Sequence, residues 1–295
     1  MRLEQLRRLP QKPRWPRGLP PHGVAGVILV AVAWPVSWAR LSPLSEYSFF
    51  PLWLGYILLV DALSLRRQGT SLLASRPATF VGMFAASVPL WWTFEGINHF
   101  TQNWHYQGGE VYSHLWFVVA SWHFSIVVPA VFVTAHLVGT LGVVQRLRHG
   151  PRLPVSGAVL ASSVALGLAA LAALLWWPDY AFSAAWLFLF LLLDPINYRW
   201  GRPSLLEQVG RGDWRMVAAF AVGALVCGWF WEMWNYWAWP KWHYAVPYFD
   251  FIRIFEMPLL GYGGYLFFGL EVYAAYHFLA GVVARVRGAL GRGMQ

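Results

Sequence analysis

Two pairs of side chains with acid-base potential recur in this sequence at the same internal spacing. Glu95 precedes Asn98 by three residues, and Glu232 precedes Asn235 by three residues, each pair in an aromatic and otherwise apolar stretch. Residues three apart share one face of a helix, so each pair can present a carboxyl group and an amide to the same point. Two carboxyl groups close together in an apolar site do not both ionise, which would create an acid and a base. We therefore identify these four residues as candidate catalytic groups.

A Trp-His-Tyr triplet follows each pair, at 104–106 and at 242–244. Tryptophan rings can form an apolar wall that stabilises a cation, and histidine can bind a ligand or hold a loop. The predicted ligand-binding residues are Trp92, Trp231, Trp104, Trp242, His105, His243 and Glu271. A structural alternative stays open for all of them, in which Glu and Asn hold the following loop and the aromatic residues form a belt at a membrane interface.

A metal site built from Glu95, His105, Glu232 and His243 is chemically possible for zinc or iron. The sequence lacks the compact spacing typical of metal ligands, so no metal is predicted. Cofactors are left undetermined. Cys227 is the single cysteine, which excludes disulfides within the chain and cysteine metal clusters.

The repeated motifs belong to a longer internal duplication. Asp61 corresponds to Asp194 at an offset of 133 residues, whereas Glu95 corresponds to Glu232 at an offset of 137. Small insertions of this kind are tolerated in loops. The predicted organisation is a basic arm at 1–22, a first repeat at 23–145, a second repeat at 155–287 and a tail at 288–295.

Composition indicates that these repeats lie in a membrane. Of the 295 residues, 58% are hydrophobic and only 12% are charged, whereas charged residues make up about a quarter of an ordinary soluble domain. A helix of about 20 apolar residues crosses a bilayer. We predict an all-α polytopic membrane protein with eight such segments, four in each of two parallel repeats: 24–39, 48–65, 78–98, 115–139, 156–176, 180–198, 214–236 and 256–284.

The positive charges predict the orientation, because loops that stay in the cytoplasm retain Lys and Arg. Placing both termini in the cytoplasm puts 19 of the 22 Lys and Arg residues on that side and leaves only Arg40, Lys241 and Arg253 outside. The net charge of +9 then reflects topology and attraction to anionic lipid rather than nucleic acid. We expect a bacterial cytoplasmic membrane, membrane lipids as partners, and the repeated motifs at the outer face. The charge pattern does not predict the oligomeric state.

Three further acidic residues fall inside or beside predicted membrane segments. Glu271 lies near the middle of the last one, where an ionised side chain costs about 2.5–3.5 kcal/mol on insertion scales. It should face the interior, in a functional or a purely structural role. Asp61 and Asp194 lie near Arg66, Arg67, Arg199 and Arg202, and structural ion pairs are favoured there.

A short segment after the second triplet resembles the membrane lycopene cyclases. Glu256, Pro258 and Leu259 precede Phe267 and Phe268, and that family has an aromatic loop, an acidic motif with proline and a Phe pair in this order. The family places adjacent acids just after the proline, where this chain has none, so the resemblance transfers no catalytic residue. The duplicated pattern as a whole also resembles a family of bacterial polytopic membrane proteins, a resemblance that implies no activity.

Three classes of function are compatible with these features. The first is an intramembrane enzyme that performs acid-base chemistry on a lipid or a small apolar or isoprenoid ligand. The second is a transporter or channel for a small solute or ion, built from parallel repeats. The third is a pigment- or haem-binding or structural subunit of a membrane complex. The sequence has no nucleotide-binding loop and no nucleophile elbow.

Overall fold

The computed structural model describes residues 18–108, 114–248 and 250–293. The described chain is built from helices, with two short two-stranded ribbons. The predicted all-α fold class is confirmed.

The first half of the chain contains three long helices and one broken helix. Its elements are α2 (Pro21–Trp38), η1 (Ser45–Tyr47), α3 (Phe49–Gln68), α4 (Leu72–Ser75), α5 (Pro77–Thr101), β1 (Trp104–Gln107), α6 (Trp116–Phe124), α7 (Val127–Val138), α8 (Gly142–Gln145) and η3 (Arg146–His149). Between α6 and α7, the Ser87 hydroxyl donates to the carbonyl of Phe124 (2.5 Å) and accepts from the N–H of Val128 (3.1 Å). This side chain satisfies backbone groups that the break in the helix leaves without helical partners.

The second half follows the same order of elements. It contains α9 (Gly157–Trp176), α10 (Pro178–Ala181), η4 (Phe182–Trp186), α11 (Phe188–Arg199), α12 (Leu205–Gly210), α13 (Arg215–Trp237), β2 (Lys241–Tyr244), β3 (Arg253–Ile254), β4 (Met257–Pro258), η5 (Leu259–Gly261) and α14 (Tyr262–Gly293). Here the second long segment is the broken one, with a bend of 40° between the helical stretch Pro178–Trp186 and α11. The segment expected at 180–198 is therefore helical but divided by a bend.

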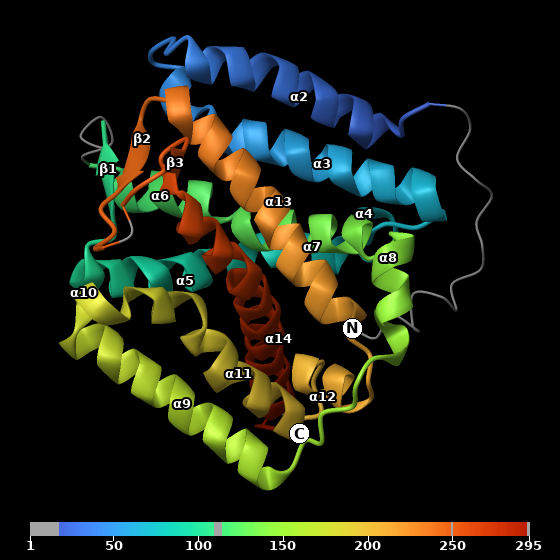
Figure 1. Ribbon diagram of the computed structural model, residues 1–295. Helices are drawn as coiled ribbons and strands as arrows, with labels where there is room; N and C mark the ends of the chain where they lie inside the picture. The colour runs from blue at the N-terminus through green and yellow to red at the C-terminus, as the bar shows by residue number, and fades with distance from the viewer. Residues whose placement is uncertain (1–17, 109–113, 249, 294–295) are drawn as a thin grey trace.

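Four helices form the centre of the molecule, and a pair flanks them on each side (Figure 1). Helices α5, α7, α13 and α14 pack against one another in the centre. The α2–α3 pair covers this group through contacts of α3 with α7, and the α9–α11 pair covers it through contacts of α11 with α14. Trp53, Phe94, Ile126 and Phe268 are among the fully buried residues of the shared core.

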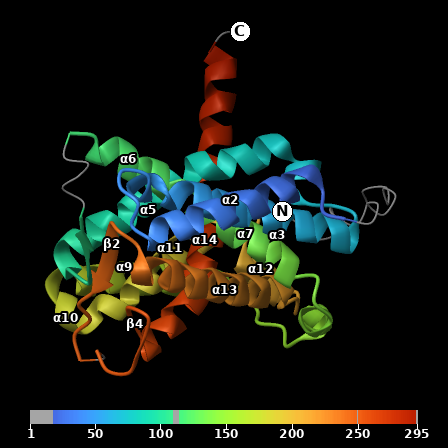
Figure 2. The ribbon, with the colours of Figure 1, turned by 90° about the horizontal axis from the view of Figure 1, so that it is seen from above.

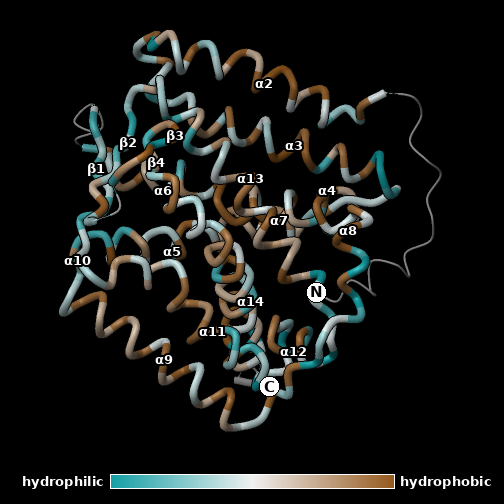
Figure 3. The backbone as a smooth tube through the Cα atoms, viewed as in Figure 1, coloured by the Kyte–Doolittle hydropathy of each residue, from teal (hydrophilic) through white to brown (hydrophobic). Residues whose placement is uncertain are grey.

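Six described helices are long and apolar enough to cross a membrane, or seven if the bent pair forms one span. They are α2, α3, the combined α6–α7 segment, α9, α13 and the helical stretch of η5 and α14. Hydrophobic residues extend along α9 in particular (Figure 3). The most apolar window of α9 has a mean hydropathy of 2.3. These helices are consistent with a multi-pass membrane protein. The expected segment 78–98 forms α5, a helix of 25 residues that is not among those six.

The ends of the described chain differ from the expected boundaries. Helix α2 begins at Pro21, inside the stretch expected to be an arm, and residues 1–17 lie outside the described part. Helix α14 does not end near residue 284 but continues to Gly293. Its C-terminal part projects beyond the other helices (Figure 2), and the expected tail at 288–295 is thus helical as far as residue 293.

Asp61 and Asp194 stabilise helix starts and do not pair with arginine, contrary to expectation. The Asp61 carboxylate accepts from the N–H of Leu73 (3.1 Å), and Asp194 accepts from the N–H groups of Leu205 and Leu206 (both 2.9 Å). These N–H groups belong to the first turns of α4 and α12. N–H groups of a first turn have no partner within their own helix. Among the described residues, neither aspartate forms an ion pair with any of the four arginines nearby in the sequence.

A candidate ligand cavity behind the β1–β2 ribbon

Each asparagine of the repeated motif holds the start of the strand that follows it. The Asn98 side chain donates to the carbonyl of Trp104 (2.8 Å) and accepts from the Trp104 N–H (3.1 Å). Asn235 makes the same two bonds with Trp242, at 2.7 and 2.9 Å. Each amide therefore positions a triplet through one donated and one accepted bond, and the catalytic role expected of Asn98 and Asn235 stays a prediction.

Glu95 accepts hydrogen bonds from three aromatic side chains on one oxygen. The donors are the hydroxyl of Tyr106 (2.6 Å) and the indole N–H groups of Trp91 (3.0 Å) and Trp104 (3.2 Å). The carboxyl group therefore fixes the orientation of two residues of the first triplet and of one residue on its own helix.

Glu232 is fully buried and accepts from two tyrosine hydroxyls. These are Tyr244 of the second triplet (2.7 Å) and Tyr265 of α14 (2.5 Å). The second carboxyl oxygen of Glu232 has no hydrogen-bond partner among the described residues. The bond from the triplet tyrosine to the motif glutamate thus occurs in both halves, whereas the remaining donors differ.

The different donors arise from one position on the two equivalent helices. Trp91 lies four residues before Glu95, and the residue four before Glu232 is Gly228. A side chain at Gly228 would collide with Tyr265, because its Cβ would lie 2.4 Å from the Tyr265 ring. The missing side chain thus leaves the space in which Tyr265 reaches Glu232, so a tyrosine from α14 replaces the local tryptophan.

The two triplets pair with each other as an antiparallel ribbon. Residues 104–107 of β1 lie opposite residues 244–241 of β2, and His105 lies directly opposite His243. Successive side chains of a strand point to opposite faces. Trp104, Tyr106, Trp242 and Tyr244 accordingly line a cavity, whereas the two histidines do not.

The cavity has a volume of about 120 Å³ and is lined by residues of the ribbon and of the central helices α5, α13 and α14, among others. An apolar cavity of roughly 150 Å³ can hold a benzene-sized molecule. Apart from the ribbon, its aromatic walls come from Phe49, Trp91, Trp116, Phe124, Trp186, Trp231, Tyr265 and Phe268. All five aromatic donors to Glu95 and Glu232 line it, but the described lining contains neither glutamate. The carboxyl groups therefore stand behind the side chains that would meet a ligand.

The tyrosines of the ribbon are permanent hydrogen-bond donors. Burial raises the pKa of Tyr106 and of Tyr244 well above the ordinary value, and the adjacent glutamate raises it further. Both hydroxyls consequently keep their protons at neutral pH. They hold those protons between a carboxyl group and the cavity.

Charged side chains are also part of the cavity lining. Lys241 and Glu46 both line it. Lys241 pairs with Glu256, and the Ser42 hydroxyl donates to Glu46 (2.8 Å). Glu256 was the acid in the segment that resembles lycopene cyclases, and here it balances the charge of this lysine and lies 3.8 Å from Arg253.

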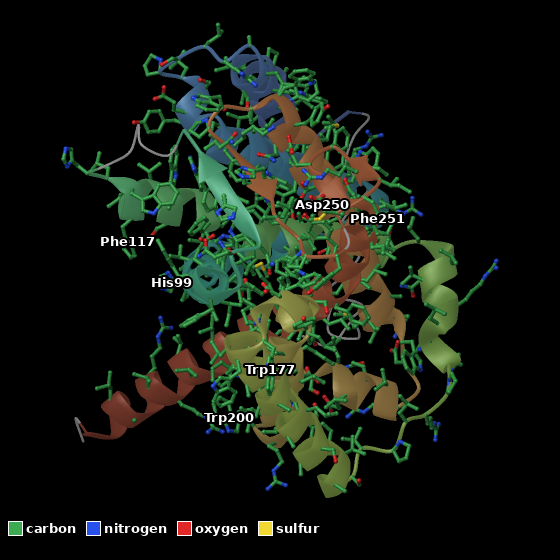
Figure 4. All side chains as sticks on the ribbon, turned by 60° about the vertical axis from the view of Figure 1, so that its left-hand side comes forward. His99, Phe117, Trp177, Trp200, Asp250 and Phe251 are labelled. Carbon is green, nitrogen blue, oxygen red and sulfur yellow. The ribbon has the colours of Figure 1, made fainter. Side chains whose placement is uncertain are left out.

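The predicted ligand-binding residues fall into two groups. Trp104, Trp242 and Trp231 line the cavity, and Trp231 stacks on Trp91 with ring centroids 5.9 Å apart. Trp92 lies elsewhere. It donates to Ser121 (2.9 Å) and stacks on the exposed Phe117 of α6, labelled in Figure 4.

Glu271 also lies outside the cavity. It is fully buried and accepts from the N–H of Leu189 (2.9 Å) in the first turn of α11. It thus stabilises the helix that restarts after the bend. Among the described residues, no group of three or more His, Cys, Asp or Glu side chains is arranged to hold a metal ion.

Sequence reasoning missed Tyr265, Trp91, Trp186 and Lys241 as lining residues. Tyr106 and Tyr244 were within the recognised triplets but were not selected. The sequence did contain a signal for Trp91 and Tyr265. The second motif has Gly228 where the first has Trp91, and this difference between otherwise similar motifs indicates that another side chain takes the place of the tryptophan.

No family model, curated protein or solved structure matches this chain. The resemblance to the membrane lycopene cyclases stays an expectation.

Proposed function

We propose that this chain captures a small, largely apolar ligand in the aromatic cavity and performs acid-base chemistry on it through tyrosine hydroxyls. The observation that carries the proposal is that the hydrogen-bond donors to both motif glutamates line one cavity. In this proposal a lipid or isoprenoid group of about benzene size enters the cavity. The tryptophan rings would stabilise positive charge that develops on it.

The proposed proton path runs from glutamate through tyrosine to the ligand. With Glu232 ionised, Tyr244 donates to it, as in the structure. When the carboxyl group is protonated, it can donate to the tyrosine oxygen, and the tyrosine proton can then pass to a ligand atom in the cavity. Glu95 and Tyr106 would provide the same path from the other half. The glutamates keep their predicted acid-base role in this scheme, but they act without touching the ligand.

The proposal includes a membrane arrangement. Eight helices would cross a bacterial cytoplasmic membrane as two parallel four-helix repeats, with both termini in the cytoplasm and the ribbon at the outer face. Asn98 and Asn235 make equivalent contacts in the two halves, and so do Glu95 and Glu232, which supports the repeats. The three cations assigned to the outer side all lie near the end of α13 or the ribbon. Arg40 donates to the Trp237 carbonyl (3.3 Å), Lys241 to that of Tyr236 (3.1 Å) and Arg253 to that of Tyr244 (3.3 Å).

Binding of an isoprenoid alcohol tests the proposal. Purified protein in lipid nanodiscs would be titrated with geranylgeraniol, of which only the terminal isoprenoid unit with its hydroxyl would enter the cavity, and tryptophan fluorescence recorded. We expect a saturable change that weakens about tenfold or more when Tyr106→Phe and Tyr244→Phe are combined, since each variant removes a hydroxyl oxygen that can accept from the ligand alcohol. Tyr180→Phe is the matched control, because Tyr180 is 74% exposed and lies outside the cavity.

Turnover of a bound lipid tests the chemical step separately. Products would be sought by mass spectrometry after incubation with membrane lipid extracts. Glu95→Gln and Glu232→Gln should retain geranylgeraniol binding and abolish product formation. Unsaturable fluorescence, or identical titrations for the double tyrosine variant and wild type, would refute the cavity as the binding site.

A transporter is the second candidate, favoured by one observation. The segment of α10, η4 and α11 is bent by 40°, and the buried Glu271 lies at the restart of the helix. Broken helices with a helix N-terminus inside the membrane are the usual binding elements of transporters. Uptake of a solute into proteoliposomes that is lost in Glu271→Gln, with geranylgeraniol binding unchanged, would favour transport over the enzyme.

A further inference from the structure

A second cavity lies at the opposite end of the second half and shares no lining residue with the aromatic one. It has a volume of about 450 Å³ and is formed by the end of α11, by α12 and by the segment that precedes α9. Tyr198, Arg202, Glu207 and Arg211 provide its polar side chains. Unlike the first cavity, it contains two guanidinium groups and no tryptophan.

Arg202 is fixed by its backbone, and one of its side-chain donors lacks a hydrogen-bond partner among the described residues. Its backbone N–H donates to the carbonyl of Asn197 (2.8 Å), which fixes the residue after the end of α11. Its side-chain Nε is buried and has no hydrogen-bond partner among the described residues. A buried N–H group of this kind is normally satisfied by protein, water or a ligand. Arg202 also lines the cavity, so a guanidinium group that lacks this bond lies where an anionic acceptor could bind.

Arg211 is held in place by Glu207. A guanidinium nitrogen of Arg211 lies 2.5 Å from a carboxylate oxygen of Glu207. This ion pair leaves the other donors of Arg211 available, because guanidinium has five N–H groups. Since one carboxylate is present for two guanidinium groups, the lining carries a formal charge of +1.

Two features near Arg202 add room and positive charge. Gly201 has a φ of +64°, and a side chain built there would meet no atom within 4 Å, so the backbone borders open space. Next to it in the sequence, Trp200, labelled in Figure 4, stacks on Phe278 of α14 with ring centroids 5.4 Å apart. The Arg285 guanidinium lies over the Trp200 ring at 3.8 Å, so a third cation is close to this end of the molecule.

We propose that this second cavity binds a phosphate group, with Arg202 and Arg211 as its donors. Guanidinium matches the geometry of phosphate and binds it through paired hydrogen bonds. The phosphate could belong to the headgroup of an anionic lipid or be free in solution, since basic pockets between helices on the cytoplasmic side of a membrane bind lipid headgroups. This proposal is independent of the function proposed for the aromatic cavity.

Thermal unfolding of the full chain measures the binding. Protein would be titrated with inorganic phosphate in detergent, and compared in nanodiscs of phosphatidylglycerol and of phosphatidylcholine. Stabilisation by inorganic phosphate identifies a site for free phosphate, and stabilisation by phosphatidylglycerol alone identifies a lipid headgroup site. In either case, Arg202→Gln should weaken binding about tenfold or more, which is the contribution of one charged hydrogen bond.

Two further variants guard against indirect effects. Arg199→Gln is the matched control, because this exposed arginine lies near the cavity in the sequence but does not line it. Glu207→Gln releases Arg211 and should tighten binding, a gain that a misfolded variant would not show. No stabilisation by either phosphate source, or an equal loss in Arg199→Gln and Arg202→Gln, would overturn the proposal.

Discussion

His105 and His243 lie directly opposite each other in the antiparallel β1–β2 ladder, with ring centroids 5.4 Å apart. They are the central residues of the two Trp-His-Tyr triplets, so the ladder pairs each triplet with its own counterpart. Trp104 faces Tyr244, and Tyr106 faces Trp242. An exchange of the two strands would therefore superimpose like residues, which places a local two-fold axis between the histidines.

A disulfide between these positions is the first prediction. Residues directly opposite each other in an antiparallel ladder have Cα atoms about 4.5 or 5.5 Å apart, which lies within the range that a disulfide bridges. In a Cys227→Ala background, His105→Cys combined with His243→Cys should crosslink within one chain under mild oxidation. Mass spectrometry of the digested protein would detect the linked peptides. His99→Cys combined with His243→Cys is the control, because His99 lies on α5 outside the ladder, and equal crosslinking of both pairs would contradict the pairing.

The second prediction concerns the space that Gly228 leaves for Tyr265. Gly228→Ala would place a methyl group 2.4 Å from the Tyr265 ring, and overpacking of this kind costs about 1–3 kcal/mol. Displacement of the ring would also separate the tyrosine hydroxyl from Glu232. We expect a lower midpoint of thermal unfolding for Gly228→Ala in detergent.

The loss of stability caused by Gly228→Ala should depend on the presence of the Tyr265 ring. Adding Tyr265→Ala to Gly228→Ala should add less destabilisation than Tyr265→Ala causes alone, because the clash has gone. Gly82→Ala on α5 is the control, since a side chain there meets no atom within 4 Å. Strict additivity of the two changes would show that Gly228 does not act through Tyr265.

The third prediction is an acid-sensitive contact outside the membrane segments. Partial burial raises the pKa of Asp213, but hydrogen bonds and charge from Arg215 outweigh it, so the pKa lies below its ordinary value. The Arg215 Nε donates to this carboxylate at 2.8 Å. A carboxyl group with a lowered pKa in the folded state stabilises the fold above its unfolded pKa. That contribution is lost as pH falls through the folded pKa.

Unfolding midpoints recorded between pH 7 and pH 3 would test this contact. Asp213→Asn should lower the midpoint at pH 7 and should lose less stability than wild type on acidification. Asp179→Asn serves as the control, because Asp179 makes no ion pair among the described residues. Parallel pH curves for wild type and Asp213→Asn would exclude a contribution from the ion pair.

The sequence predicted the helices well because their apolar runs are long. Each of the eight predicted segments contains helix, and the triplets were correctly placed after α5 and α13. The bend before α11 was not predictable, since residues 180–193 contain no proline, glycine or charged residue. The Leu189 N–H at the bend is satisfied by Glu271, which lies 82 residues away from it in the sequence. The hydrophobic pattern of a single segment cannot indicate an acceptor that is so distant in the sequence.

The candidate site was predictable only in part for a related reason. The three-residue spacing correctly put Glu95 and Asn98 on one helix face. It could not show that aromatic side chains would stand between the carboxyl groups and the cavity, because Tyr106 and Tyr244 reach the glutamates from strands and Tyr265 reaches Glu232 from α14. Packing between distant segments decides which group meets a ligand.

The last prediction separates a structural from a chemical role for Glu271. The backbone N–H of Leu189 depends on its carboxyl oxygen, and a buried donor without a partner costs about 1–3 kcal/mol. Glu271→Ala removes this acceptor and leaves a cavity, so its unfolding midpoint should fall well below that of wild type. Glu271→Gln keeps an acceptor of the same shape and should unfold close to wild type. If both variants unfold like wild type, Glu271 does not hold α11. If Glu271→Gln is stable but loses solute uptake in proteoliposomes, the ionisable proton of this residue serves transport, because the amide preserves the hydrogen bond to α11 and removes only the titration.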